Sequence, residues 1–182
     1  MKAFRRRDGV LAARVDADEL GLLASLVEQV AELLGDGPDA APEDPFARWA
    51  SEFGGSEALD HSDPIVRRLF PDAYADAAAS AEYRALTEDA LRRGRLEAAH
   101  IVLADLEAVE GTSLRVPDAH VDAWLRTVNA VRLSLAARLG IETEDDHDAL
   151  SALPRKDARR YVLDVYDWLG WILESLLEAF SC

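Results

Sequence analysis

The residues that could carry chemistry are few, and their spacing matches no common catalytic or metal-binding pattern. The four histidines, at positions 61, 100, 120 and 147, are too far apart for any two to act as neighbouring metal ligands on one helix. The chain also lacks the HExxH, CxxC, GxxxxGK[ST], GxSxG and GxGxxG motifs of common metal-dependent, nucleotide-binding and acyl-transfer enzymes. We therefore predict a protein that is not an enzyme and that has no catalytic residue, metal site or cofactor.

Two acidic segments are predicted to be mobile surface loops. The first, near residues 35–45, combines glycine, proline and acid without periodicity. The second, near residues 142–153, contains the run EDDHD, which lacks the patterned glycine and the bidentate glutamate of a calcium-binding loop. We interpret both as solvated loops rather than cation sites.

One arginine, Arg132, falls in the middle of an apolar helical pattern. A guanidinium in that position must be paired or must extend to solvent, because an unpaired interior charge is very costly. We predict a buried polar cluster of Arg132 with Asn129 one turn away and with Glu82, Asp164 or Asp167 as the carboxylate. The functional alternative is an anion-binding cleft at Arg132.

A tryptophan, Trp171, is the second misfit. It belongs to the predicted last helix, residues 155–180, whose broad apolar side comprises Tyr161, Val162, Val165, Trp168, Leu169, Ile172, Leu173, Leu176, Leu177 and Phe180. Trp171 instead falls on the polar side, among Asp164, Asp167, Glu174, Ser175 and Glu178. The interpretation we prefer from the sequence is that a loop or a neighbouring helix covers Trp171. The alternative is partner binding by Trp171, Asp164, Asp167, Glu174 and Glu178, because tryptophan is enriched at interface hot spots.

The overall charge disfavours nucleic acid as a partner. Lys and Arg number 20 against 35 Asp and Glu, which gives a net charge of -15 and a field that repels phosphate backbones. Two basic clusters run against this average: Arg5, Arg6 and Arg7, and then Arg155, Lys156, Arg159 and Arg160. A DNA-binding regulator that uses both clusters on one face is therefore the alternative to a protein-binding one.

The chain is expected to be cytoplasmic. Cys182 is its single cysteine, so no disulfide can form within the chain, as is usual in a reducing compartment. The first residues, MKAFRRRDG, contain no apolar signal segment, and no later apolar run reaches the length of a membrane span. We predict no association with membranes.

The first third of the chain predicts a hairpin and a helix. Short strands at residues 4–7 and 10–15 flank Asp8-Gly9, a pair that suits a tight turn. Asp16 and Glu19 have capping-box spacing before a helix over about 18–34. A third strand over about 112–116 would complete the small antiparallel sheet.

The other predicted helices follow from apolar periodicity and from helix start and stop residues. Asp63-Pro64 and Pro71 indicate two closely spaced helix starts, and Gly94 is expected to separate a helix over 72–93 from a second that stops near Gly111. We expect a short helix bearing Phe46, Trp49, Ala50 and Phe53, and long helices over 118–139 and 155–180. The predicted fold is mainly α: a single-domain bundle of about five longer helices with a small antiparallel sheet.

The chain resembles an actinobacterial family of helical domains of unknown function over nearly its whole length. The resemblance rests on F-x-R with D-G before a helix, DPIVRRLFPDAY and EYRALT within 63–87, WLRTVNAVRLSLAARLGI at 124–141, and YDWLGWILESLL at 166–177. Family members tend to carry Leu-Asn-Asp before the arginine of the long helix, where this chain has Val-Asn-Ala at 128–130.

The resemblance implies a regulatory or adaptor role and no established activity. Some members are labelled transcriptional regulators, and their genes often lie near those of a Clp protease adaptor and of a sulfur-carrier cysteine pathway. Together with the residues above, this favours a non-enzymatic regulatory or adaptor protein that binds another protein. The chain itself is expected to be a monomer or a homodimer, and no role is assigned to Cys182.

Overall fold

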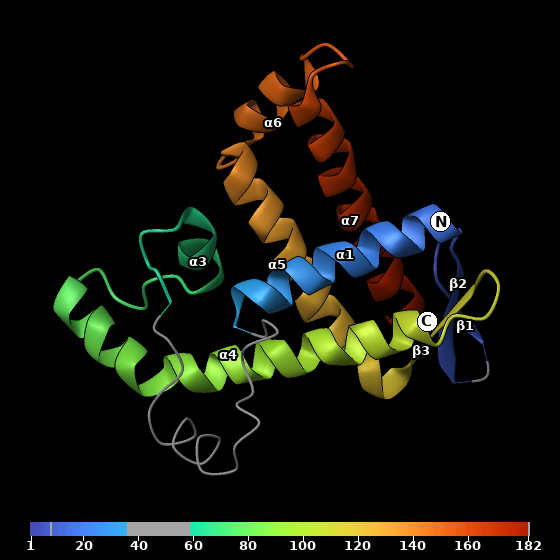
Figure 1. Ribbon diagram of the computed structural model, residues 1–182, viewed down its shortest axis with the longest axis horizontal. Helices are drawn as coiled ribbons and strands as arrows, with labels where there is room; N and C mark the ends of the chain where they lie inside the picture. The colour runs from blue at the N-terminus through green and yellow to red at the C-terminus, as the bar shows by residue number, and fades with distance from the viewer. Residues whose placement is uncertain (8, 36–58, 182) are drawn as a thin grey trace.

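The fold is described from a computed structural model, which covers residues 1–7, 9–35 and 59–181 (Figure 1). The predicted acidic loop near 35–45, apart from Gly35, lies outside the described residues. The predicted short helix with Phe46, Trp49, Ala50 and Phe53 also lies outside them, as does Cys182.

A three-stranded antiparallel sheet forms as predicted. Strands β1 (Arg5–Arg7), β2 (Val10–Arg14) and β3 (Ser113–Pro117) lie in the order β1-β2-β3, with Leu11 opposite Val116. Alternate residues point to the core, so Leu11, Leu114 and Val116 are fully buried. β1 is an edge strand whose three arginines are exposed.

The first helix, α1 (Ala17–Leu33), begins with the predicted capping box. The Asp16 side chain accepts from the backbone N–H of Glu19, and the Glu19 side chain accepts from the N–H of Asp16. Leu23 and Val27 place its apolar side in the core.

The predicted pair of helix starts yields only one helix. Helix α3 (Pro64–Leu69) starts at Pro64, and the Asp63 side chain accepts from the N–H of Ile65. The prediction of a second start at Pro71 was wrong. Residues 71–76 are not helical, and the next helix is capped by Asp76 instead.

The predicted break at Gly94 was also wrong, because α4 (Ala77–Glu107) runs through it without interruption. A glycine inside a helix costs only about 1 kcal/mol relative to alanine. Burial of Ala98, Ala99, Val102 and Leu106 beyond it favours continuation of the helix.

The long helix α5 (Val121–Leu139) follows a short 3-10 turn, η1 (Asp118–His120). It ends at Gly140 in the left-handed conformation, with φ of 70°. Helix α6 (Glu144–Ser151) then occupies most of the segment predicted to be a mobile loop near 142–153, so that prediction was wrong. Thr143 and Asp146 form a capping box, a signal that the acidic composition had masked.

The last helix, α7 (Ala158–Ser181), buries a narrower arc than predicted. Tyr161, Leu177 and Phe180 were assigned to the core side but are exposed, while Ser175 was assigned to the polar side but is buried. The reason is packing direction: α5 covers the arc around Val165, Leu169, Ile172 and Leu176, and β1 packs over Ser175.

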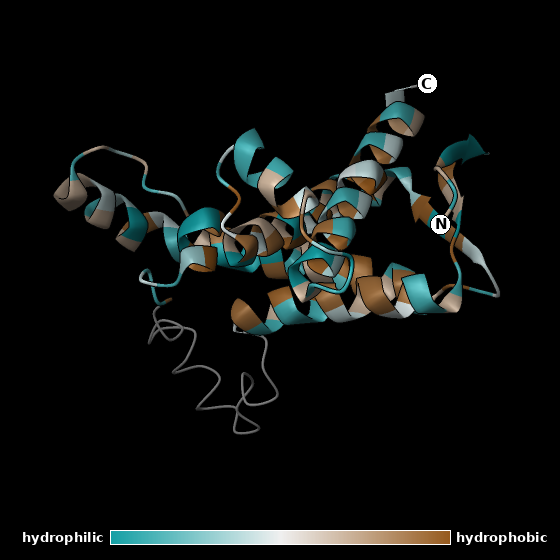
Figure 2. Cartoon of the chain, turned by 90° about the horizontal axis from the view of Figure 1, so that it is seen from above, coloured by the Kyte–Doolittle hydropathy of each residue, from teal (hydrophilic) through white to brown (hydrophobic). Residues whose placement is uncertain are grey.

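The helices assemble around α5, which packs against α7, α4, α3 and α1. The sheet closes one end of the assembly, beside the C-terminal end of α7 (Figure 1). Hydrophobic and hydrophilic positions are interleaved along the helices (Figure 2), and the buried residues of α1 and α7 recur at helical intervals, so each helix turns one side to the core. The predicted fold class is confirmed: the structure is mainly helical with one small sheet, and its described part has four long helices and two short ones.

Among the described helices, arginine side chains often donate to a backbone carbonyl at or just after the helix end. The last carbonyls of a helix have no partner within it and carry a partial negative charge, which favours a guanidinium nearby. In the described residues the donor and acceptor pairs are Arg92 with Leu34 after α1, Arg95 with Leu69 of α3, Arg68 with Ile141 after α5, Arg160 with Ser151 of α6, and Arg6 with Phe180 of α7.

Candidate protein-binding site

The acidic tryptophan face, defined as Asp164, Asp167, Trp171, Glu174 and Glu178, is a single exposed stripe along α7. Every one of these side chains is exposed, and their spacing of three or four residues keeps them on one side of the helix. The opposite side of α7 packs against α5, which fixes the orientation of the helix. The stripe therefore faces away from the core.

The two ends of this face differ in charge compensation. Asp164 pairs with Arg160 at 3.2 Å, and Asp167 accepts from His147 at 2.9 Å. In the part of the chain that the structure describes, Glu174 and Glu178 take part in no ion pair or hydrogen bond through their side chains. The half of the face beyond Trp171 therefore presents uncompensated carboxylates.

Trp171 is 36% exposed, between the two halves. The interpretation preferred from the sequence required a loop or helix to cover it, and no described segment covers it fully. An indole that is partly packed and partly accessible suits an anchor residue, because much of its apolar surface remains to be buried by a partner.

The predicted buried cluster around Arg132 was wrong. Asn129 and Glu82 are exposed, Asp164 pairs with Arg160, and Asp167 pairs with His147. Arg132 instead stacks on Tyr166, with 4.3 Å from the guanidinium carbon to the ring centroid.

The absence of a side chain at Gly170 makes room for this stack. A Cβ at Gly170 would lie 3.3 Å from the Arg132 Nε atom, which is buried without a hydrogen-bond partner in the described structure.

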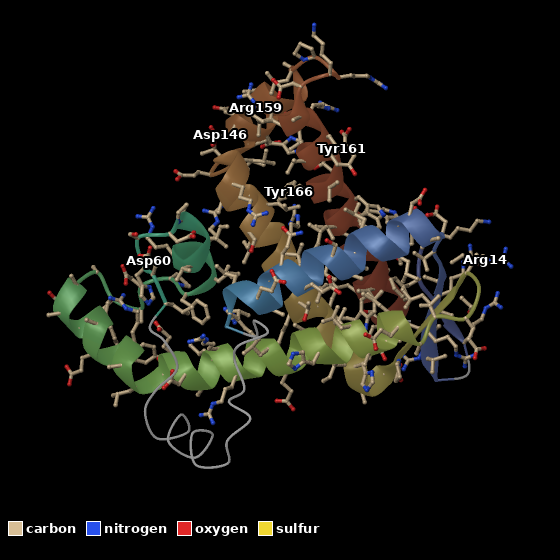
Figure 3. All side chains as sticks on the ribbon, viewed as in Figure 1. Arg14, Asp60, Asp146, Arg159, Tyr161 and Tyr166 are labelled. Atoms are coloured by element: carbon tan, nitrogen blue, oxygen red, sulfur yellow. The ribbon has the colours of Figure 1, made fainter. Side chains whose placement is uncertain are left out.

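The two basic clusters lie at opposite ends of α7. Arg6 donates to the Phe180 carbonyl and pairs with Asp118, whereas Arg159 lies in the first turn of α7 and pairs with Asp157 at 2.9 Å. At a rise of about 1.5 Å per residue, the 159–180 segment separates them by roughly 30 Å. Figure 3 shows Arg159 far from the sheet that carries Arg14. The remaining cluster residues, Arg5, Arg7, Arg155 and Lys156, are exposed.

One polar cluster escaped the sequence analysis. Asp105 of α4 accepts from Trp124 Nε1 at 2.8 Å and lies 3.0 Å from His120 Nδ1. Trp124 is fully buried, so its indole N–H needs this acceptor. Asp105, His120 and Trp124 are 4 to 19 positions apart on different elements, and no local spacing could have indicated the cluster. It secures the start of α5 to the end of α4.

A surface cavity of about 310 Å³ lies between α3 and the end of α5. Arg67, Arg68 and Glu142 line it together with small and apolar residues. Arg68 is held there by its hydrogen bond of 2.8 Å to the Ile141 carbonyl.

Shifted pKa values occur at helix starts, at Asp60 in the turn before α3 and at one half-buried arginine. Backbone N–H groups of Glu142 and Thr143 lower the pKa of Asp146, and the Arg159 guanidinium lowers the pKa of Asp157. Burial lowers the pKa of Arg95, which stacks on Phe70. These causes are structural, since they follow from helix capping and packing rather than from a shared site.

Within the described residues, no group of three or more His, Cys, Asp or Glu side chains is placed to hold a metal ion. In the same part of the chain, no helix combines the length and apolar character needed to cross a bilayer.

Comparison with known proteins identifies the family. The sequence profile of the "Domain of unknown function (DUF2017)" matches residues 1–180. A protein of Mycobacterium leprae (strain TN) named "Putative oxidative stress regulator AosR" is 30% identical over 175 residues, covering 88% of this chain and 78% of that protein. No solved structure matches the chain. The predicted resemblance is confirmed: the chain belongs to the DUF2017 family of domains of unknown function.

Proposed function

We propose that this chain is a non-enzymatic regulatory protein that acts by binding another protein through the acidic tryptophan face of α7. The observation that carries the proposal is Trp171, a partly exposed indole followed on the same stripe by Glu174 and Glu178, which have no charge partner in the described residues. The mycobacterial relative is named a regulator, and this supports a regulatory role for a second member of the family.

The chemistry of the face indicates the partner's chemistry. Trp171 requires an apolar contact, and the carboxylates around it require Lys or Arg side chains, so the partner segment is basic and carries at least one apolar anchor. Charge attraction accelerates association, whereas burial of the indole slows dissociation. Binding is therefore expected to weaken with added salt but to persist in part.

The test is capture of partners from a native lysate by the immobilised chain, with and without nuclease. Trp171→Ala should lose the specific partner, and a Glu174→Gln, Glu178→Gln double variant should bind it more weakly at low salt. Tyr161→Ala is the matched control, because Tyr161 is an exposed aromatic residue on the same helix outside the face. Its captured proteins should match those of the unaltered chain.

A different outcome would favour the DNA-binding alternative. If the captured material were chromosomal fragments that nuclease removes, and if Trp171→Ala captured the same proteins as the unaltered chain, the proposal would be overturned. The separation of the basic clusters along α7, and the use of Arg6 and Arg160 as helix C-terminal donors, support the protein-binding proposal over that alternative.

A further inference from the structure

The N-terminal half of α4 is a long helical segment with almost no core contact. Among the buried residues of α4, Ser80 is the only one before Arg92. Ser80 is itself occupied locally, since its hydroxyl donates to the Tyr74 carbonyl at 2.8 Å. In both views the start of α4 extends away from the other helices, with only the α3 region nearby (Figures 1 and 2). Residues 77–91 therefore form an arm.

This arm exposes large apolar side chains. Leu86 is 80% exposed, more than any other large apolar residue in the described structure, and Leu91 and Tyr83 are exposed beside it. An uncovered leucine at the centre of such an arm points to an interface.

The residues around Leu86 are complementary to a second copy of themselves. Glu82, Leu86, Ala90 and Arg93 follow one another at intervals of four, four and three residues, so they share one side of α4. All four are exposed, and neither the Glu82 nor the Arg93 side chain forms an ion pair in the described part of the chain. The Arg93 Nε atom donates to the Asp89 carbonyl of its own helix, which leaves the outer guanidinium nitrogens available.

An antiparallel pair of arms places these groups opposite one another. When the two-fold axis passes midway between positions 87 and 88, Glu82 and the partner's Arg93 lie at the same level, each roughly 8 Å from the axis. Leu86 of each copy then lies beside Ala90 of the other, and the small alanine permits close approach. The two-fold symmetry repeats each contact, as in most homodimers.

We infer that this protein forms a homodimer through antiparallel packing of the α4 arms, with Leu86 at the centre and reciprocal Glu82–Arg93 ion pairs at its edges. The occupant of the exposed arm is therefore a second copy of this chain. The inference does not depend on the proposed function, because α7 lies elsewhere and stays accessible in such a dimer.

Sedimentation equilibrium of the full chain over a wide concentration range tests the inference. A reducing agent must be present, because the single thiol of Cys182 could otherwise join two chains covalently. The unaltered chain should show a concentration-dependent dimer, and Leu86→Asp should be monomeric. Leu177→Asp is the matched control, since Leu177 is an exposed leucine on α7, and it should dimerise normally. Circular dichroism confirms that each variant is folded.

Charge reversal tests the antiparallel arrangement itself. Glu82→Arg or Arg93→Glu alone should raise the dimer Kd about tenfold. Because the two-fold axis repeats every contact, each substitution replaces two ion pairs with two like-charge contacts. The combined variant should restore the original Kd. A monomeric unaltered chain would overturn the inference and would mean that something other than a second copy covers the arm. A double reversal that stays weak would overturn this mode of packing.

Discussion

At the scale of single residues, Ser175 shows how one hydroxyl joins distant parts of the chain. The backbone N–H of Phe4 donates to the Ser175 Oγ atom at 2.6 Å in a buried contact. Ser175→Ala leaves this N–H without an acceptor, so we expect a loss of about 1–3 kcal/mol in the free energy of unfolding. Urea denaturation measures the loss.

The control for this variant lies on the same helix. The exposed Ser181 hydroxyl donates to the Leu177 carbonyl of its own helix, and Ser181→Ala should change the free energy of unfolding by less than about 0.5 kcal/mol. Equal effects of the two substitutions would contradict the importance assigned to the Phe4–Ser175 bond.

The contact of Arg132 with Gly170 predicts a coupling that a double-mutant cycle can detect. Gly170→Ala gains up to about 1 kcal/mol of helix propensity. In the unaltered chain that gain is offset, because the new Cβ would crowd Arg132 at 3.3 Å and push it from Tyr166. In an Arg132→Ala background the full gain should appear in thermal or urea unfolding. Additive effects would mean that Gly170 is not needed for the stack.

Asp146 predicts a pH dependence of stability. Its folded pKa lies below the ordinary value of 3.8 because backbone N–H groups bind the charged form. The capping contribution is therefore present above the unfolded pKa and is lost as pH falls through the folded pKa. Asp146→Asn should lower the melting temperature at neutral pH, and the difference should shrink in acid.

The neighbouring Asp145 serves as the control for this pH effect. It is exposed in the same first turn of α6, and no hydrogen bond to its side chain is found in the described residues. Asp145→Asn should leave the melting temperature nearly unchanged at neutral pH. A loss equal to that of Asp146→Asn would mean that net charge, rather than capping, sets the effect.

At the scale of elements, alanine substitutions at two glycines are expected to change the free energy of unfolding in opposite directions. One glycine has a helical backbone and the other a left-handed one. Gly94 is helical, and a Cβ there would meet no atom within 4 Å apart from the adjacent backbone of its own helix, so Gly94→Ala should raise the free energy of unfolding by about 0.5–1 kcal/mol. Gly140 ends α5 with φ of 70°, and Gly140→Ala should lower it by about 1 kcal/mol. Stabilisation by both substitutions would contradict the assigned conformations.

The same elements show which local signals suffice for prediction. The Asp16–Glu19 capping box, the Asp-Gly turn and Gly140 each predicted an element correctly, because each acts through the backbone within a few residues. Three signals misled. At Pro71 and in the acidic 142–153 segment, local caps at Asp76 and at Thr143 with Asp146 decide where the helices start, and Gly94 does not end α4 because residues beyond it are buried. Ala98 to Leu106 pack on α5 and α1, which no residue near Gly94 indicates.

The residues that make up the candidate binding face could be predicted from the sequence, but the ion pairs that they form could not. Helical spacing alone placed Trp171 among carboxylates, and exposure of the stripe agrees with that placement. The pairing of Asp167 with His147 depends on how α6 folds back against α7, which is a tertiary arrangement. For the same reason, the stacking partner of Arg132 could not be inferred from the residues near it.

At the scale of the whole molecule, a strongly acidic chain uses several of its 20 Lys and Arg residues structurally. Arg6, Arg68, Arg92, Arg95 and Arg160 all donate to carbonyls at or just after the ends of helices. If the α4 arms join two chains, the dimer presents two acidic tryptophan faces. A partner with two basic segments would then bind with an affinity enhanced by linkage.

The contact between Phe4 and Ser175 also sets an order in time during synthesis on the ribosome. The two residues are separated by 171 positions, so the N-terminal strands leave the ribosome long before the helix that covers them. Until then the β1 side of the sheet lacks its packing partner, and a nascent chain that stops before α7 should remain sensitive to protease. Release of α7 should bring resistance in a single late step, so that quality control would recognise an unfinished chain by its uncovered first strands.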